Sequence, residues 1–173
     1  MRARRFWKAV TLDHSNFLDE FVTLLRESSV RWCLIGGQAV NAYADPVVSL
    51  DLDVVIAACE LDALLPTLER RFRVTRFRHS LNIAAGDSDL RVQVQLDPRY
   101  SAFLEHAETR PVLGIELPVA RVEDVLQGKV WAAEDSARRG SKRQKDLADI
   151  ARLIETYPEL RARVPAETLD RLI

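Results

Sequence analysis

The sequence predicts an α+β fold, in which a short mixed β-sheet flanked by helices is followed by a C-terminal helical subdomain. Two observations predict it. Over residues 1–120, short runs with the composition of strands are interspersed with helical patterns, whereas residues 121–173 show helical patterns alone. We therefore expect residues 1–120 to form an α/β core. Residues 121–173 are expected to form a helical subdomain that packs on this core in a single compact unit.

Helices in the core are predicted by apolar residues at helical spacing and by the residues that stop them. Asp13 or Ser15 is the expected N-cap of the first helix, and Pro46 follows the second. The helices expected here lie at residues 13–25, 38–43, 61–71 and 100–108.

Strands are predicted by short apolar runs between turn residues, and most clearly by alternation. Residues 90–96 alternate apolar and polar side chains, which predicts a half-buried strand with one polar face. Turns are expected at residues 78–80 and 86–89. The expected strands lie at residues 31–35, 47–56, 72–77, 81–84, 90–96, 111–115 and 117–120.

Composition limits the class of protein. The chain has 173 residues, of which 47% are hydrophobic and 29% charged, which predicts one folded domain. Its formal net charge of −1 argues against binding polyanions by bulk charge but permits a local basic cleft. Its apolar runs are too short to span a bilayer, and the basic N-terminus lacks the apolar stretch of a signal peptide. We therefore expect a cytoplasmic protein without a membrane partner.

The C-terminal part is expected to hold two helices, near residues 121–137 and 144–156, joined by the basic segment 138–143. This segment either attracts phosphates or RNA, or is a solvated loop. Lys129 falls inside the apolar face of the first helix. A lysine there is costly to bury unless it is paired, reaches a polar site or extends to solvent.

In the second helix, Lys142 precedes Asp146 by four residues, and Lys145 precedes Asp149 by four. Taken alone, this spacing indicates ordinary surface ion pairs.

Two aspartates on one predicted strand are the main chemical signal. Because side chains alternate along a strand, Asp51 and Asp53 share one face, and Leu50, Leu52 and Val54 point to the core on the other. A shared Mg²⁺ would relieve the repulsion between the two carboxylates, since this ion takes one or two carboxylates together with phosphate oxygens and water. A solvated acidic edge strand is the alternative.

A pair of glycines strengthens that signal. Gly36 and Gly37 follow a buried apolar run and open a helical pattern. Glycines at such a position let a phosphate approach the backbone, and the helix N-terminus offers free N–H groups. The alternative is a tight turn that binds nothing.

Combined, these motifs resemble the nucleotidyltransferase superfamily of DNA polymerase beta, whose signature is hG[GS], a short helix and [ST]-x-D-x-D. The matching residues run from Ile35 to Val40 and from Ser49 to Asp53. The segment from Lys142 to Ile150 is similar to the R-x-K-D-x-x-D-h helix of a small bacterial branch, which includes AbiEii-type toxins and lincosamide or aminoglycoside nucleotidyltransferases. The resemblance covers residues 35–155.

The resemblance implies a nucleotidyltransferase fold and an enzyme that moves a nucleoside monophosphate from an NTP to a hydroxyl, with Mg²⁺ or Mn²⁺. It implies an acceptor that is RNA (a tRNA end, for example), a protein or a small molecule. It also implies the toxin of a toxin–antitoxin pair, with a separate antitoxin protein as partner. The metal-binding and catalytic residues would be Asp51 and Asp53. The nucleotide-binding residues would be Gly36, Gly37, Gln38, Ser49, Lys129, Arg143 and Lys145. The supporting residues would be Gln93, Asp146 and Asp149.

Two departures from the family pattern keep an alternative open. The third carboxylate of the family is replaced by Gln93 or Gln95, unless Asp97 at the end of the same strand takes its place. The arginine that many relatives carry before the D-x-D is absent, because residues 46–48 read Pro-Val-Val. A glutamine cannot accept the proton of the attacking hydroxyl. The alternative is therefore a catalytically weak or inactive nucleotide-binding or interaction module on the same fold.

Overall fold

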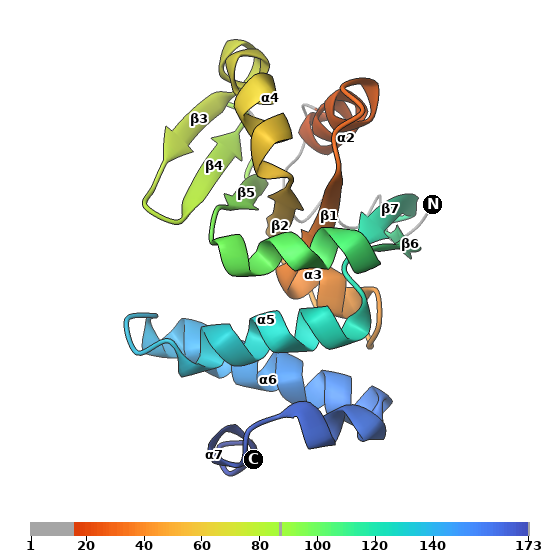
Figure 1. The fold of residues 1–173 in the computed structure, drawn as a ribbon, viewed down its shortest axis with the longest axis vertical. Coiled ribbons are helices and arrows are strands. Elements are labelled where there is room, and N and C mark those ends of the chain that lie inside the picture. The colour runs from red at the N-terminus through yellow and green to blue at the C-terminus, as the bar shows by residue number, and fades with distance from the viewer. Residues whose placement is uncertain (1–15, 87, 173) are drawn as a thin grey trace.

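A computed structural model describes residues 16–86 and 88–172. Within these residues, seven strands form one sheet in the order β3-β4-β5-β2-β1-β7-β6 (Figure 1). The pairs β2–β5 and β1–β7 are parallel and the other pairs are antiparallel, so the sheet is mixed, as the sequence predicts. The strands are β1 (Trp32–Ile35), β2 (Asp51–Ile56), β3 (Arg73–Arg76), β4 (Ser80–Ala84), β5 (Arg91–Gln95), β6 (Glu108–Val112) and β7 (Ile115–Val119).

Helices lie on both sides of this sheet (Figure 1). Helices α2 and α4 lie together at one end of the sheet. At the other end lies α3, and the long helices α5 and α6 stack beneath it. The helices are α2 (Phe17–Glu27), α3 (Gly36–Asn41), α4 (Ala58–Arg71), α5 (Val122–Glu134), α6 (Gly140–Thr156) and α7 (Ala166–Leu169), with 3₁₀ helices η1 (Pro98–His106) and η2 (Pro158–Arg163).

The core is built by the apolar faces that the sequence pattern indicates. Leu52 and Val54 of β2 are fully buried, and Phe17 and Phe21 of α2 pack with Phe72 at ring-centroid distances of 5.2 and 6.5 Å. Burial of such side chains stabilises the fold by about 1.5–3 kcal/mol each. No helix among the described residues is both long and apolar enough to cross a lipid bilayer.

Several predicted boundaries are corrected. Strand β2 begins at Asp51 rather than at residue 47, and Leu50 is 38% exposed instead of facing the core. The segment expected as the helix 100–108 is the 3₁₀ helix η1. The predicted strand 111–115 is wrong, because the hairpin turn between β6 and β7 lies within it, at Leu113 and Gly114. Both residues have positive φ, as a two-residue turn that matches the twist of the strands requires.

The C-terminal helices also differ from their predicted bounds. Helix α5 ends at Glu134, and α6 begins at Gly140. Four of the six residues of the expected basic joint are therefore helical, and among them Lys142 and Arg143 are good helix formers. The predicted caps of the first helix, Asp13 and Ser15, lie outside the described residues.

Candidate active site

Asp51 and Asp53 lie on the same face of β2, as the strand alternation predicts. Strand β2 runs between β1 and β5, where Asp53 is opposite Ile35 on one side and opposite Gln93 on the other. Asp51 is opposite Arg91 of β5. The D-x-D pair therefore sits in the middle of the sheet, with β1 and the start of α3 on one flank and β5 on the other.

Gly36 makes room for Asp53. Its φ is +68°, a conformation that glycine adopts without steric penalty. A Cβ at this position would lie 2.1 Å from Oδ2 of Asp53, so any side chain there would displace the carboxylate. The first glycine of the motif thus leaves the space that the Asp53 carboxylate occupies.

The second glycine faces a different neighbour. A Cβ on Gly37 would lie 3.3 Å from the Ser49 hydroxyl oxygen and 3.9 Å from Nζ of Lys145. The fold therefore brings together three residues from separate segments of the chain, Gly37, Ser49 and Lys145.

Charges around the two carboxylates differ. Asp51 lies between Arg91 and Lys142, at 3.7 Å from Nε of the first and 3.8 Å from Nζ of the second. Burial raises the pKa of Asp53 above its ordinary value, and the nearby charge of Asp51 raises it further, while Lys129 partly offsets the shift. A cation bound between the two carboxylates would relieve the repulsion.

A hollow of about 290 Å³ adjoins the pair. It has five cationic side chains against three carboxylates, so it carries a local positive charge in a chain whose formal net charge is −1. Such a site suits a polyphosphate, whose negative charge the lysines and arginines can neutralise. The residues lining it are Gly37, Asp51, Asp53, Gln93, Lys129, Arg138, Arg139, Lys142, Lys145 and Asp146.

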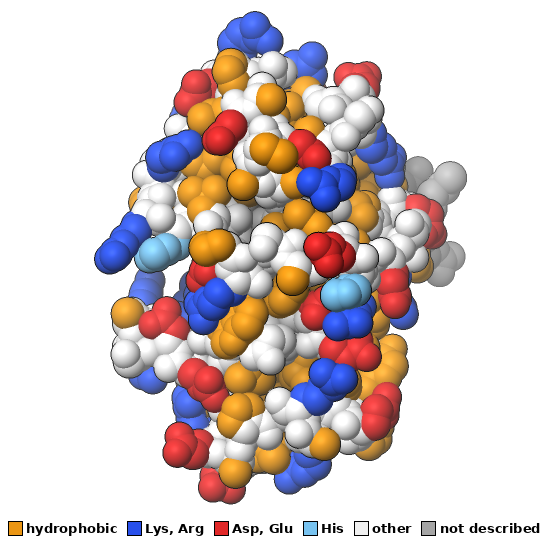
Figure 2. Space-filling model, in the orientation of Figure 1, with side chains coloured by type: hydrophobic (Ala, Val, Ile, Leu, Met, Phe, Trp, Pro, Cys, Tyr) orange, Lys and Arg blue, Asp and Glu red, His pale blue; other side chains and the backbone are white. Residues whose placement is uncertain are grey.

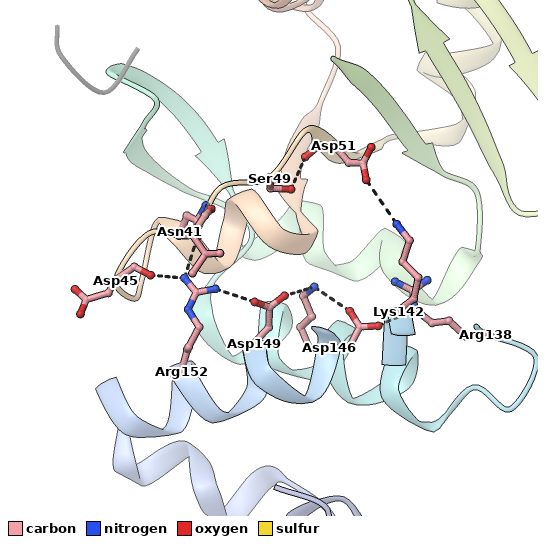
Figure 3. Close-up of polar contacts among 11 residues, drawn as sticks. Asn41, Asp45, Ser49, Asp51, Arg138, Lys142, Asp146, Asp149 and Arg152 are labelled. Carbon is pink, nitrogen blue, oxygen red and sulfur yellow. Dashed lines mark hydrogen bonds and ion pairs between the residues drawn. The ribbon is translucent and has the colours of Figure 1, made fainter. Parts of the chain in front are cut away.

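One wall of this hollow is a buried ion-pair network between α5 and α6 (Figure 3). Nζ of Lys129 lies 3.0 Å from Asp146 and 2.7 Å from Asp149. Arg138 contacts the other oxygen of Asp146 at 2.7 Å, and Arg152 contacts Asp149 at 2.8 Å. Burial alone would lower the pKa of Lys129, but the charges of Asp149 and Asp146 outweigh it and raise the pKa.

The network continues into the loop before β2 (Figure 3). Arg152 donates to the side-chain oxygen of Asn41 at 2.8 Å and also to the backbone carbonyl of Asp45. Asn41 in turn bonds both the N–H and the carbonyl of Val47, at 2.9 and 2.7 Å. Helix α6 therefore holds the loop that leads to the aspartate pair.

Some predicted site residues have other contacts. Gln38 is 1% exposed and donates to the backbone carbonyl of Ser49 at 3.0 Å. Arg143 does not line the hollow, and its Nε is buried without a hydrogen-bond partner among the residues described. Asp146 and Asp149 ion-pair with Lys129 instead of with Lys142 and Lys145, so the expected surface pairs on α6 do not form.

The three residues considered for the position of the third carboxylate lie on β5 or just after it. In register, Gln93 stands directly across from Asp53. Oε1 of Gln95 accepts from the backbone N–H groups of Leu96 and Asp97, each at 3.0 Å. Asp97 is held by the Arg99 guanidinium at 2.7 Å, whose hydrogen bonds keep the pKa of that carboxyl below its ordinary value.

Sequence reasoning missed several residues of the site. Arg91 shares the polar face of β5 with Gln93, so alternation alone indicated its direction. Lys142, Arg138 and Arg139 belong to the basic segment, but no sequence signal showed that the segment faces Asp51. That placement depends on how α6 packs against the core.

Several solved structures are similar to most of the chain, among them the following three. No protein-family model and no curated protein sequence matches it. The structure of the antibiotic-resistance factor ANT(2″)-Ia matches with a TM-score of 0.56 and 13% identity, over 90% of this chain and 86% of that one. An antigenic nucleotidyltransferase-like protein from Paracoccidioides brasiliensis matches with a TM-score of 0.54 and 16% identity, over 86% of this chain and 75% of that one.

The third is the lincosamide antibiotic adenylyltransferase LnuA with lincomycin bound. It has a TM-score of 0.53 and 12% identity, over 80% of this chain and 97% of that one. At these identities the likeness concerns the fold. The chain therefore has the nucleotidyltransferase fold, which confirms the fold that the G-G and D-x-D motifs imply.

Proposed function

We propose that the protein is a Mg²⁺-dependent nucleotidyltransferase that moves a nucleoside monophosphate from an NTP to an acceptor hydroxyl. The observation that carries the proposal is the positively charged hollow directly beside Asp51 and Asp53. A phosphate site next to a carboxylate pair is what this reaction needs, because phosphoryl transfer depends on positioning and on charge neutralisation. The fold, shared with known nucleotidyltransferases, supports the same reading.

The residues of the hollow have different parts in this proposal. Lys142 and Lys145 are exposed lysines on its rim and bind the triphosphate, together with Arg138 and Arg139. Lys142 lies 3.8 Å from Asp51, so it can exchange that carboxylate for a phosphate oxygen when the nucleotide enters. Gly37 presents backbone without a side chain to the same space.

In this proposal, the buried residues position parts of the site and do not contact the nucleotide. Lys129 holds Asp146 and Asp149 and thereby fixes α6, while Gln38 fixes the carbonyl of Ser49. These contacts set the distance between the lysines of α6 and the aspartates of β2. A shift of that distance would separate the phosphates from the metal site.

Asp51 and Asp53 are the residues that would hold the metal. They offer two carboxylates on one strand face, a donor set that Mg²⁺ or Mn²⁺ takes when phosphate oxygens and water complete the shell. When bound, the ion would neutralise charge on the phosphates and orient them for in-line attack. The acceptor oxygen forms a bond to the α-phosphorus, the bond to the bridging oxygen breaks, pyrophosphate leaves, and the hydroxyl proton passes to water.

A second function is favoured by one observation, which is Gln93 at the position opposite Asp53. An amide cannot act as the base that a third carboxylate would supply. On this reading the chain binds nucleotides and transfers them slowly or not at all.

The biological role proposed for the active enzyme is that of a toxin. The similarity of segment 142–150 to the AbiEii-type helix supports this role, which predicts that induction of the protein arrests growth and that the arrest requires Asp51 and Asp53.

The test is transfer of label. Purified protein, Mg²⁺ and each α-labelled NTP are incubated with a cell lysate as the source of acceptors. The variant Asp51→Asn with Asp53→Asn serves as the inactive form. Asp62→Asn with Glu69→Gln, which changes two exposed acids of α4, is the matched control.

Label on a lysate component that is lost only in the first variant supports the transferase. Binding of NTP without any transfer supports the nucleotide-binding module. Absence of both contradicts both functions.

A further inference from the structure

The sheet face that carries Asp51 and Asp53 continues over three more strands. By register, Asp53 is followed across the sheet by Gln93 of β5, Asn82 of β4 and Thr75 of β3. The neighbouring row runs from Asp51 through Arg91 and Ala84 to Arg73. With strands about 4.8 Å apart, these rows extend about 14 Å from β2 to β3.

This face is polar and partly exposed, and the opposite face is core. Leu81, Ile83, Val92 and Val94 point the other way and are fully buried. The alternation fixes which side chains lie on the outer face, because a register shift of one residue would expose the buried apolar side chains. The outer face is therefore a defined surface that leads away from the aspartate pair.

Its chemistry suits a polyanion with planar bases. Strands β3, β4 and β5 contain no acidic residue, and their outer face carries Arg73 and Arg91. Phe77 shares the outer face by alternation, and its N–H donates to the Ser80 carbonyl at the end of the hairpin. The Phe77 residue is 53% exposed. Oδ1 of Asn82 is buried on this face without a hydrogen-bond partner among the residues described.

The edge of the sheet next to this face is rich in free arginine. Arg71, Arg73 and Arg78 are exposed, and within the described part of the chain no carboxylate lies within 4 Å of their guanidinium groups. In the candidate site, by contrast, Arg91 and Arg138 each pair with an aspartate. Figure 2 shows basic side chains along the left edge of the molecule, over β3 and the β3–β4 turn of Figure 1.

A second hollow lies on the outer face, beside the β3–β4 turn residue His79. It has a volume of about 410 Å³ and lies between the ends of β4 and β5 and helix α5. Ser80 and Gln93 line it on the sheet side, and Tyr100 and Trp131 line it on the other. The two aromatic rings lie 5.3 Å apart, edge to face. Gln93 and Arg138 line both this hollow and the basic hollow beside Asp53, so the two spaces are neighbours. Asp97 and Asp135 also line this hollow, and Asp97 is paired with Arg99.

From these observations we propose that the acceptor is a single-stranded RNA that lies across β3, β4 and β5 with its terminal ribose beside Gln93 and Asp53. Arg73 and Arg91 bind its phosphates, and Phe77 stacks on a base. Sheet faces with exposed aromatic and basic side chains bind single strands in this way, because stacking tolerates any base and the cations track the backbone. The inference rests on the proposed transferase function and names its acceptor.

The reaction at the RNA end balances without a further reagent. The terminal ribose oxygen bonds to the α-phosphorus of the NTP, and the bond from that phosphorus to the bridging oxygen breaks. Pyrophosphate leaves with the bonding electrons, and the ribose proton passes to water. The RNA grows by one nucleotide.

Binding is measured first, without NTP, so that it does not depend on transfer. Fluorescence anisotropy follows a ten-nucleotide oligouridine RNA labelled at its 5′ end, titrated with the full chain at several salt concentrations. Phe77→Ala and Arg73→Ala remove a stacking and a phosphate contact from the outer face. Arg76→Ala is the matched control, because it removes the same charge from the same strand on the opposite face.

We expect Phe77→Ala to weaken binding at least fivefold, as loss of one stacked base does. Arg73→Ala should reduce the slope of log affinity against log salt by about one. Arg76→Ala should change affinity less than twofold. Equal effects of Arg73→Ala and Arg76→Ala, or equal affinity for the deoxyribose oligonucleotide, would overturn the assignment. Unchanged melting curves show that the variants are folded.

The second arm adds Mg²⁺ and each α-labelled NTP to the same RNA and, in a parallel reaction, to the cell lysate. Label on the RNA that is reduced by Phe77→Ala supports the inference. Label on another lysate component, with no binding of the RNA, overturns the inference and leaves the transferase function intact. Binding that depends on Phe77 without transfer to any acceptor contradicts the transferase function, and with it the role of the RNA as acceptor.

Discussion

The carboxylate of Asp53 lies in the space that a side chain on residue 36 would fill. A Cβ built on Gly36 would come within 2.1 Å of Oδ2 and 2.8 Å of Cβ of Asp53. Gly36 also has a φ of +68°, a left-handed backbone conformation that is strained for residues with a Cβ. The G-G motif and the D-x-D motif are therefore one structural unit, because the first provides the space in which the second stands.

This relationship predicts that Gly36→Ala weakens metal binding. The methyl group must push Asp53 away from Asp51, and the left-handed backbone adds about 1–2 kcal/mol of strain. Mn²⁺ affinity, measured by electron paramagnetic resonance, should fall at least tenfold, with a lower melting temperature. Gly86→Ala is the control, since a Cβ there meets no atom within 4 Å. Unchanged Mn²⁺ affinity in Gly36→Ala would contradict the coupling.

Replacing Gln93 by aspartate tests whether a third carboxylate opposite Asp53 speeds nucleotide transfer. Gln93 stands opposite Asp53, whose pKa burial and Asp51 already raise, so a third carboxylate adds repulsion. We expect Gln93→Asp to lower the melting temperature without metal and to enlarge the increase that Mg²⁺ produces. Nucleotide transfer should rise at least tenfold, because a general base typically contributes about 10²–10⁴-fold.

Gln93→Asn is the control for the loss of the longer side chain. If it matches Gln93→Asp in both melting temperature and transfer rate, the charge at this position has no role.

Lys129 is expected to stabilise the fold more than it binds nucleotide. Lys129→Met leaves Asp146 and Asp149 buried beside one arginine each, without the lysine that joins them. Breaking a buried ion pair in this way costs about 3–5 kcal/mol, to be measured by urea denaturation. Lys145→Met, at an exposed position on α6, should change the free energy of unfolding by less than about 0.5 kcal/mol. Full stability with lost NTP affinity in Lys129→Met would show instead that the lysine contacts phosphate.

Local patterns were sufficient for the features that depend on one segment. Alternation placed Asp51 and Asp53 on one face and Leu52 on the other, because the period of a strand is two. The apolar face of α5 indicated that Lys129 must be paired, reach a polar site or extend to solvent, and the structure shows that it is paired. The resemblance of the two motifs to a known superfamily gave the fold, and the similar solved structures confirm it.

Features that depend on register or tertiary packing could not be predicted. Gln93 and Gln95 share a face, and only the pairing of β5 with β2 shows that Gln93 faces Asp53. Spacing on α6 suggested Lys142 as the partner of Asp146, yet α5 packs so that Lys129 takes that place. Leu50 fits the core side of the alternation, but it precedes β2 and is exposed because the strand begins one residue later.

Arg152 is predicted to order the loop that leads to the aspartates. It joins Asp149 to Asn41 and to the carbonyl of Asp45, so Arg152→Ala removes the link between α6 and this loop. Hydrogen exchange followed by mass spectrometry should become faster in peptides covering residues 42–50, and KM for NTP should rise. Arg161→Ala, at an exposed position outside this network, should leave exchange in that loop unchanged. Unaltered exchange in Arg152→Ala would show that Asn41 holds the loop without help from α6.

Cys33 offers a reporter for opening of β1, an interior strand of the sheet. The thiol is fully buried in β1, and burial raises its pKa to about 12, whereas Cys59 is exposed at the start of α4. Because the thiolate is the reacting form, we expect Ellman's reagent to modify Cys59 in the native protein and Cys33 only after denaturation. In Cys59→Ser, any slow reaction measures how often β1 opens, and bound NTP should slow it because Gly36 and Gly37 directly follow this strand. Rapid reaction of both thiols in the native protein would contradict the burial of Cys33.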